Sequence, residues 1–279
     1  MKVDLHMHST ASDGTDAPAA LAERCRAAGL THAVLTDHDT MAGTAAFLAA
    51  ARAQGIRTVS GIEFSAEWDG ELHILVYGAD TTDAALGQVL CGLKEKREER
   101  MRRMLVQLQK EGREVSYAAV QACAGGGSVG RPHLAQALCD AGYAASIADA
   151  FERYLTPGRP GYVPRHSLRV EEILEAAQAA GGLAVLAHPK LTRTDDYDAL
   201  FVRLRAGGLQ GVEAFYPLHS DAECRYFYAL AEKHGLFVTQ GSDFHGMRRP
   251  SVRIGLEGRG ADTPLFLEGI RRIFEKKQA

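Results

Sequence analysis

Two histidines lie two residues apart near the start of the chain, in the segment VDLHMHSTASDG. Apolar and polar residues alternate along residues 3–8, which is typical of a β-strand. Because residues two apart in a strand share a face, His6 and His8 are expected to project side by side. Neutral imidazole is a common ligand of divalent metals, so the pair indicates a metal site. The same pattern also fits a half-buried strand whose polar face happens to carry two histidines.

Further histidines and carboxylates occur at the ends of other predicted strands, and they decide between these two interpretations. They are Asp13, His38, Glu63, His73, His188, Asp243 and His245. Together with the first pair, six of the 11 histidines fall at strand ends. Histidines that serve only packing are not expected to gather in this way, so a site for several metal ions is favoured. Asp37 and Asp39 flank His38 and are expected to orient it.

The nine candidate ligands combine imidazole and carboxylate groups and include no thiolate. This donor set suits Zn²⁺, Mn²⁺ or Fe²⁺. Nine ligands are too many for one ion, but they suit ions that share Glu63, because its two oxygens can bridge two cations. The sequence therefore predicts two or three divalent metal ions, with positions left for water and substrate.

Strand-like and helical segments alternate in the first and last thirds of the chain, and these elements must position the ligands. Strands are predicted at 3–8, 32–36, 57–65, 71–78, 182–189, 211–217 and 236–245, and helices at 18–29, 43–55, 197–207 and 222–235. Alternating β and α units indicate an α/β fold with a parallel sheet, covered by helices and closed into a barrel. In such barrels, active sites are built where the strands end.

The alternation stops in the middle of the chain. Between about 86 and 165 the sequence contains a long charged helix, a glycine-rich loop followed by a second helix, and a segment rich in proline and glycine, but no buried strand. We therefore predict a small helical domain inserted into the barrel. The predicted parts are 1–88 (barrel, first part), 89–165 (inserted helical domain) and 166–279 (barrel, second part).

Composition and charge limit the classes of function. The formal net charge of −3 gives no general attraction to polyanions, and no DNA-binding motif is found. The five cysteines are dispersed and form no C-x-x-C pair, which is typical of reduced thiols. The sequence shows no signal peptide and no apolar run long enough to span a membrane, so we expect a cytoplasmic protein. The oligomeric state is left open.

Six segments resemble the characteristic motifs of the polymerase and histidinol phosphatase (PHP) superfamily, in the order found in that family. They are DLHMHS, LTDHD, GIEFS, ELHILVYG, LAHP and GSDFH. The segments GRPHLAQAL, YLTPGRPGYVP and GVEAFYPLHS resemble one branch of the superfamily. Members of that branch remove phosphate from nucleoside 3′,5′-bisphosphates or trim nucleotides from the 5′ end of short RNA.

The resemblance implies a distorted barrel of seven βα units, a small inserted helical domain and two or three divalent metals. It also implies how the ligands are divided: His6, His8, Glu63 and Asp243 for one metal, Glu63, His73 and His188 for a second, and Asp13, His38 and His245 for a third. Catalytic roles are expected for Glu63, Asp243 and His188. The expected reaction is attack on phosphorus by a hydroxide that the first two metals activate, with the third metal binding a phosphoryl oxygen.

Two residues outside the metal ligands are candidate substrate contacts. Arg131 follows the glycine-rich loop and precedes Pro132, which is typical of a helix N-terminus, where free N–H groups bind anions. An arginine there can grip a phosphate through two nitrogens. His133 is a second candidate. The loop also spells G-x-G-x-x-G, but no predicted parallel strand precedes it, so a dinucleotide site is not favoured. The loop alternatively serves only as a flexible surface connection.

Other functions share some of these motifs. A histidinol-phosphate phosphatase has the same metal motifs, and a non-catalytic PHP module keeps the fold. A metal-dependent amidohydrolase also begins with H-x-H, but commonly uses a bridging lysine, where this chain offers Glu63. The expected substrates are therefore a small nucleotide or a short 5′-phosphorylated RNA.

Overall fold

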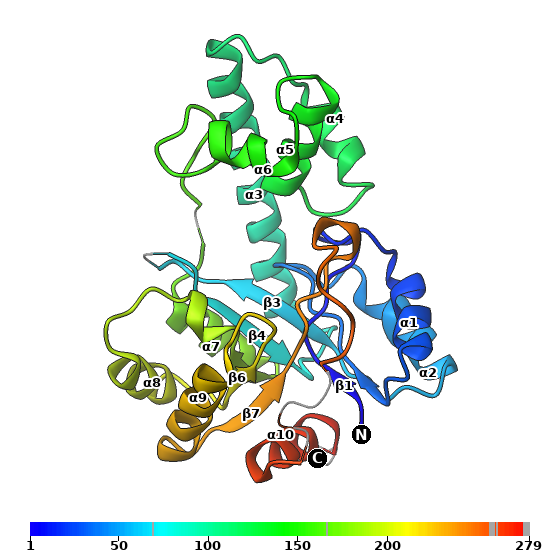
Figure 1. Ribbon diagram of the computed structural model, residues 1–279, viewed down its shortest axis with the longest axis vertical. Helices are drawn as coiled ribbons and strands as arrows, with labels where there is room; N and C mark the ends of the chain where they lie inside the picture. Colours follow the sequence, from blue (N-terminus) through cyan, green and yellow to red (C-terminus); the bar gives the residue numbers. More distant parts are fainter. Residues whose placement is uncertain (69, 166, 257–259, 261, 276–279) are drawn as a thin grey trace.

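The computed structural model of the chain consists of an α/β body and a helical extension that projects from it (Figure 1). The structure describes residues 1–68, 70–165, 167–256, 260 and 262–275. Within these residues two β-sheets are accompanied by ten α-helices, so the predicted α/β class is confirmed.

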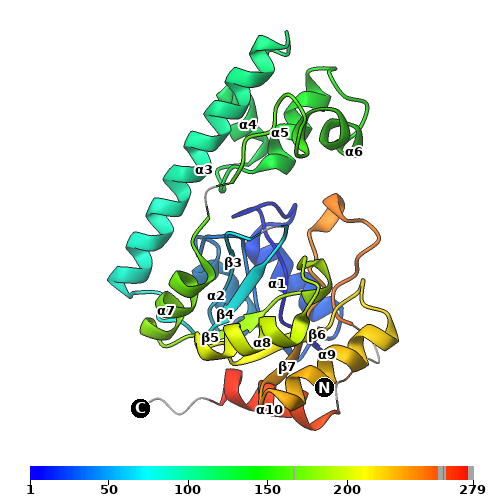
Figure 2. The ribbon, with the colours of Figure 1, turned by 90° about the vertical axis from the view of Figure 1, so that its left-hand side faces the viewer.

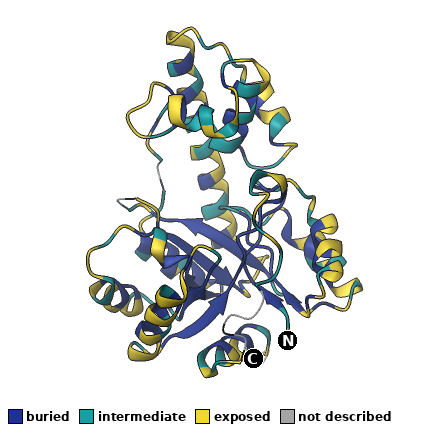
Figure 3. Cartoon of the chain, viewed as in Figure 1, coloured by how far each residue is buried: buried dark blue, intermediate teal, exposed yellow. Residues whose placement is uncertain are grey.

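Seven short strands form the centre of the body in the described part of the chain. They are β1 (Val3–Asp4), β2 (His32–Ala33), β3 (Gly61–Ser65), β4 (His73–Tyr77), β5 (Leu183–Leu186), β6 (Gly211–Phe215) and β7 (Phe237–Gln240). Every residue in these strands is buried, as expected for strands that are covered on both faces. Figure 3 shows this buried centre surrounded by half-exposed helices.

The strands are arranged in two sheets. β1 and β2 pair in parallel, and the order in the larger sheet is β3-β4-β5-β6-β7. An isolated β-bridge lies beside each edge of the larger sheet. Met7 pairs with Phe244, which follows β7, and His38 pairs with Glu63 of β3. The five-stranded sheet is not closed, so the closed barrel of seven units remains a prediction.

β4 differs from the expected parallel sheet, because it runs antiparallel to both of its neighbours. Only a short connection separates it from β3, which is too short for the crossover helix that a parallel pair requires. The register places His73, the first residue of β4, opposite Ser65, the last residue of β3. The expectation that every ligand strand ends at the site is therefore wrong for β4, which begins there.

Six helices cover the sheets of the body. They are α1 (Pro18–Ala27), α2 (Thr44–Ala53), α7 (Val170–Ala179), α8 (Tyr197–Ala206), α9 (Asp221–Lys233) and α10 (Pro264–Phe274). In α10, Phe266, Ile270 and Ile273 recur at helical spacing and pack in one buried cluster with Phe237 of β7. The apolar face of each helix thereby fixes its position on the sheet.

The extension contains the remaining helices and a core of its own. Its elements are α3 (Ala84–Lys110), α4 (Tyr117–Cys123), α5 (Arg131–Asp140), α6 (Ile147–Ala150) and a π-helical turn (Phe151–Leu155). Figure 2 shows α3 as a long rod that leaves the body and carries the shorter helices at its far end. Their buried apolar residues form a cluster separate from those of the body.

α3 belongs to both parts of the molecule. Leu86 and Leu93 pack in the main cluster of the body, whereas Met101, Met104 and Leu108 pack in the cluster of the extension. The predicted boundary between 88 and 89 falls within this continuous helix, and it remains a prediction. The predicted start of the second barrel part, residue 166, lies outside the described residues.

Candidate metal centre

The nine predicted ligands converge at one edge of the sheets, although they come from separate segments of the chain. His6, His8 and Asp13 follow β1, His38 follows β2, Glu63 lies in β3, His73 begins β4, His188 follows β5, and Asp243 and His245 follow β7. Their ligand atoms form overlapping groups whose members all lie within 4.8 Å of one another. The structure thus brings together all nine residues that the sequence singled out.

Glu63 lies at the centre of this group and is fully buried. Each of its two oxygens faces a different set of imidazole nitrogens. The distances are 3.2 Å from Oε2 to Nε2 of His6 and of His8, 2.9 Å from Oε2 to Nδ1 of His38, 2.7 Å from Oε1 to Nδ1 of His73, and 3.0 Å from Oε1 to Nε2 of His188. A carboxylate placed in this way can serve two cations at once.

Asp243 provides the second carboxylate at the centre. Its Oδ1 lies 3.1 Å from Nε2 of His8, 3.5 Å from Nε2 of His6 and 3.4 Å from Nδ1 of His245. One face of the site therefore consists of two histidines that follow β1, the carboxylate of Glu63 in β3 and the carboxylate of Asp243, which follows β7. This arrangement matches the ligand set that the family resemblance assigns to one metal.

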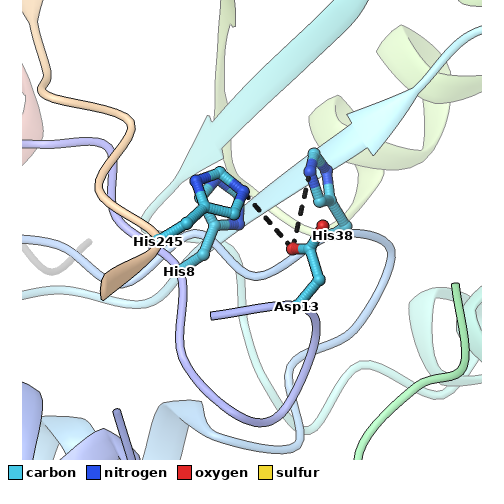
Figure 4. Close-up of side chains that lie close together, drawn as sticks. All are labelled: His8, Asp13, His38 and His245. Carbon is cyan, nitrogen blue, oxygen red and sulfur yellow. Dashed lines mark ion pairs between the residues drawn. The ribbon is translucent and has the colours of Figure 1, made fainter. Parts of the chain in front are cut away.

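A neighbouring group contains His8, Asp13, His38 and His245, and Figure 4 shows their side chains directed toward one another. Oδ1 of Asp13 lies 3.4 Å from Nε2 of His245 and 3.9 Å from Nε2 of His38. Three of these residues form the set implied for a third metal, and His8 joins the two groups. Glu71 was not among the predicted ligands, and its Oε1 lies 3.7 Å from Nδ1 of His73.

Several buried ligand atoms lack a hydrogen-bond partner, which fits a metal-binding role. Nε2 of His6, Nε2 of His8, Oε2 of Glu63 and Oδ1 of Asp13 are buried and make no hydrogen bond within the described residues. Buried polar atoms without a partner cost free energy, so they are rare unless another group satisfies them. These nitrogens and oxygens lie close together but form no hydrogen bonds with one another. Bound cations would give all of them a coordination partner.

Electrostatics favours charged carboxylates in the site. Burial alone would raise the pKa of Glu63, but the neighbouring His38, His6 and His73 outweigh it and hold this pKa well below its ordinary value. The pKa of Asp243 is lowered in the same way, against burial, by its histidine neighbours and Arg249. Both carboxylates are therefore ionised at neutral pH, as metal ligands must be.

The backbone adopts uncommon conformations around the site. Asp39, His188 and Asp243 are the non-glycine residues with positive φ within the described part, at 52°, 24° and 55°. Such conformations cost free energy in residues with a side chain, and they cluster at functional sites. The surrounding structure thus holds two of the nine ligands in strained positions.

Glu213 is a residue of the site that the sequence analysis missed. It is fully buried in β6, its two oxygens lie 3.1 and 3.2 Å from Nδ1 of His6, and it accepts a 2.9 Å hydrogen bond from the backbone N–H of His188. A carboxylate behind a histidine ligand fixes the orientation of the ring and which nitrogen carries the proton. The signal in the sequence was a single acidic residue within the apolar strand GVEAFYP.

The outer oxygen of Asp243 has its own partners. Oδ2 accepts a 2.9 Å hydrogen bond from the hydroxyl of Tyr216 and is paired with Nη1 of Arg249. Arg249 is partly exposed, whereas Asp243 is buried. The carboxylate therefore presents one oxygen to the histidines and the other to this tyrosine and arginine.

Asp37 and Asp39 do not serve the same purpose. Asp37 accepts hydrogen bonds from the backbone and hydroxyl of Ser9 and from the hydroxyl of Ser12, so it holds the loop that follows β1. Asp39 points toward the extension, where it is paired with two arginines. Their contacts support the loops around His38 and differ from the expected orienting role.

The two predicted substrate contacts lie at the start of α5. Arg131 contacts its own extension, since its guanidinium lies 5.6 Å from the ring centroid of Phe151 and Nη1 lies 3.5 Å from the carbonyl of Leu155. His133 is buried, and its Nδ1 accepts a 3.0 Å hydrogen bond from the N–H of Gly130. Burial and the charge of Arg248 lower the pKa of His133 to about 4, so its ring is neutral.

The glycine-rich loop connects the extension to the body. The N–H of Ser128 donates to the carbonyl of Ala11 at 2.9 Å, and a Cβ at Gly127 would lie 2.1 Å from the carbonyl oxygen of Thr10. Only a glycine permits this approach. The loop follows a helix, α4, which agrees with setting aside a dinucleotide site.

No helix in the described residues is both long enough and apolar enough to cross a membrane.

Comparison with known proteins gives consistent results. The PHP domain family matches residues 4–158. The chain is 36% identical over 249 residues to a 3′,5′-nucleoside bisphosphate phosphatase from Chromobacterium violaceum, covering 87% of each chain. It is 33% identical over 290 residues to the 5′-3′ exoribonuclease Rnm of Escherichia coli, covering 99% of this chain and 94% of that protein.

A solved structure shows the same fold. A protein from Bifidobacterium adolescentis, assigned to the metal-dependent phosphoesterases, superposes with a TM-score of 0.86 at 30% sequence identity, covering 97% of this chain and 96% of that one. The family match spans more than half of the chain, and the relatives exceed 30% identity over most of it. The motifs, the convergent ligands and these similarities lead to one conclusion: the chain belongs to the PHP domain family.

Proposed function

We propose that this protein hydrolyses phosphate esters of nucleotides, either nucleoside 3′,5′-bisphosphates or the 5′ ends of short RNA. That it is a phosphoesterase follows from its family membership and from its relatives. The observation that carries the proposal is the convergence of nine candidate imidazole and carboxylate ligands, with Glu63 at their centre.

Two or three divalent cations, Mn²⁺, Zn²⁺ or Fe²⁺, fit this donor set. His6, His8, Glu63 and Asp243 would hold one, Glu63, His73 and His188 a second, and Asp13, His38 and His245 a third. When bound, such cations supply Lewis acidity, which neutralises charge on the phosphoryl group and makes hydroxide accessible at neutral pH.

The residues of the chain have distinct roles in this proposal. Glu63 and Asp243 supply the negative charge that holds the cations together, and His188 completes the group on the side of β5. Glu213 fixes the ring of His6 through Nδ1. Arg131, with the N-terminus of α5, provides a fixed positive charge for a substrate phosphate outside the ligand group.

His133 is proposed to act beside Arg131 as a neutral hydrogen-bond donor. Its Nδ1 accepts a hydrogen bond from the N–H of Gly130, so the proton of the neutral ring is on Nε2. This N–H can donate a hydrogen bond to a phosphate oxygen.

The competing functions are distinguished by specific features. A non-catalytic module could lose ligands, whereas this chain retains the whole set. An amidohydrolase centre has no place for Asp13, His38 and His245, which form a group here. A histidinol-phosphate phosphatase would share the ligands, so only the substrate separates it from the proposed function.

One experiment tests the proposal. The purified protein is analysed for metal content, and phosphate release is compared for adenosine 3′,5′-bisphosphate, 5′-phosphorylated oligoribonucleotides and histidinol phosphate. We expect two or three metals per chain and a preference for either nucleotide substrate. A preference for histidinol phosphate would overturn the substrate assignment. A protein that binds none of these metals when they are supplied, and releases phosphate from none of the substrates, would overturn the whole proposal.

A further inference from the structure

Glu71 is a carboxylate at the edge of the candidate metal centre that none of the three ligand sets uses. It lies in the short connection between β3 and β4, and its Oε1 is 3.7 Å from Nδ1 of His73. One oxygen of Glu71 and one nitrogen each of His73 and His188 all lie within 4.8 Å of one another. These three side chains therefore have a spacing that suits ligands of one metal ion.

The backbone explains why Glu71 reaches the centre. The N–H of Ala66 donates to the carbonyl of Leu72 at 2.9 Å, which extends the pairing of β3 and β4 beyond the last paired residues of the two strands. Residues two apart in an extended chain share a face, so Glu71 and His73 are directed to the same side. The segment ELH thus places two ligand types side by side, as HMH does near the start of the chain.

The ligand sets differ in size. The set proposed for the first cation has four members, whereas the set proposed for the second has three, Glu63, His73 and His188. Oε1 of Glu63 lies 2.7 Å from Nδ1 of His73 and 3.0 Å from Nε2 of His188. The same nitrogen of His73 therefore faces two carboxylates. Because zinc commonly takes four ligands, Glu71 offers the member that the second set lacks.

Glu71 differs from the other members in its exposure. Its side chain is 46% exposed, compared with 10% for His73 and 2% for His188, and Glu63 is fully buried. Contacts of an exposed carboxylate are weak, because water competes for its oxygens. Catalytic metal sites keep one position for water or substrate. A carboxylate at the solvent edge can fill such a position and still give way.

We propose that Glu71 is a displaceable fourth ligand of the second cation, which a phosphate oxygen of the substrate replaces. This inference rests on the proposed function and deepens it, because it assigns the position at which the substrate reaches the second cation. The exchange breaks no covalent bond in the protein or the substrate. Glu71 stays ionised and turns its carboxylate toward water.

The test compares two variants of Glu71 with a matched control. Glu71→Gln removes the charge, whereas Glu71→Asp keeps the charge and shortens the side chain by one methylene group. The control, Glu67→Gln, removes an exposed carboxylate from the same connection. Because both positions are exposed, we expect all three variants to fold.

The first measurement is metal retention. Protein loaded with Zn²⁺ is titrated with a chelator, and the zinc released per chain is measured. We expect the affinity for one bound ion to weaken about 10- to 100-fold in both Glu71 variants, and to stay unchanged in the control. A loss in Glu71→Gln alone would show that Glu71 acts only through its charge, and no loss in either would show that it is not a ligand. Both results would overturn the inference.

The second measurement is the affinity of the zinc-saturated protein for inorganic phosphate, determined by calorimetry. We expect phosphate to bind about fivefold more tightly to both Glu71 variants, because no carboxylate has to be displaced, and to bind the control as it binds the wild type. Unchanged or weaker binding would contradict displacement by a phosphate oxygen. Neither measurement requires a substrate to be hydrolysed, so either failure would leave the proposed function standing.

Discussion

The α/β body and the helical extension place their polar residues in opposite ways. The body gathers nine imidazoles and carboxylates at one edge of its sheets, and seven of them are buried, whereas Asp13 and His38 are half-buried. The extension keeps an apolar core and presents long arginine side chains toward the body. Strands hold ligands in fixed positions, as a metal site requires, whereas long arginine side chains have many rotamers.

This difference suggests a division of labour. The candidate metal ligands belong to the body, and the candidate substrate contacts Arg131 and His133 belong to the extension. Changes in the body should therefore abolish the reaction or loosen the metals, whereas changes in the extension should alter its stability or its substrate preference alone.

The largest effect is expected for Glu63→Gln. The amide removes the negative charge that both oxygens present to five histidines, so we expect kcat for phosphate release to fall by at least about 10²–10³-fold, with the fold retained. Steady-state kinetics and circular dichroism check this. The control is Glu67→Gln, an exposed glutamate just beyond β3. Near-normal turnover in the Glu63 variant would remove that residue from the mechanism.

A core truncation in the extension should separate the two parts. Leu134 is fully buried in the cluster of the extension, so Leu134→Ala should lower the free energy of unfolding of the extension by about 2–5 kcal/mol. Hydrogen exchange should show faster opening of α5 while the strands of the body remain protected. Leu204→Ala on α8 is the matched truncation in the body. If Leu134→Ala accelerated exchange equally in both parts, the cores would not be independent.

Glu213→Gln should weaken metal binding without altering the ligands themselves. Losing the charge behind His6 and one acceptor for the N–H of His188 should reduce metal affinity about 10- to 100-fold. Competition with a chelator measures this directly. Glu232→Gln, an exposed change on α9, should leave metal affinity unchanged. Equal metal affinity in the two variants would limit Glu213 to a structural role.

The smallest effect concerns pH and the stability of the body. Burial and the charge of Arg57 lower the pKa of His32 to about 4, below the ordinary value of about 6.5. Between these values the unfolded chain binds a proton that the folded chain does not, so stability falls as pH falls. The contribution is up to about 1.4 kcal/mol per pH unit.

Denaturation of the wild type and of His32→Gln between pH 4 and 6.5 measures this contribution. The variant should lose less stability on acidification than the wild type. Parallel curves would show that the proton on His32 does not distinguish the folded chain from the unfolded one.

The sequence predicted the ligands better than the strands that carry them. His73 was assigned to the end of a parallel strand, yet it begins an antiparallel one. His73 still lies beside the other candidate ligands, because reversing a strand exchanges its two ends and the first residue of β4 lies opposite the last residue of β3. The sequence also predicted a sheet closed into a barrel, whereas the five-stranded sheet is not closed within the described residues. Closure depends on hydrogen bonds between segments far apart in the chain, which local patterns do not encode.

Partners of the ligands were harder to predict than the ligands themselves. Glu213 is a single acidic residue in a predicted apolar strand. No sequence motif connects it with His6, which lies near the other end of the chain. Asp39 was expected to orient His38, but it faces arginines that lie 58 and 126 residues further along the chain. Such pairings follow from packing, which local sequence patterns do not encode.

By itself, the sequence determined which residues are candidate metal ligands, because residue types and alternation along a strand are local properties. Only the tertiary structure decided which histidines lie close to Glu63, which acid supports His6 and which arginines pair with Asp39. These contacts join segments that are distant in the chain, and burial sets their strength by removing the water that would otherwise weaken them.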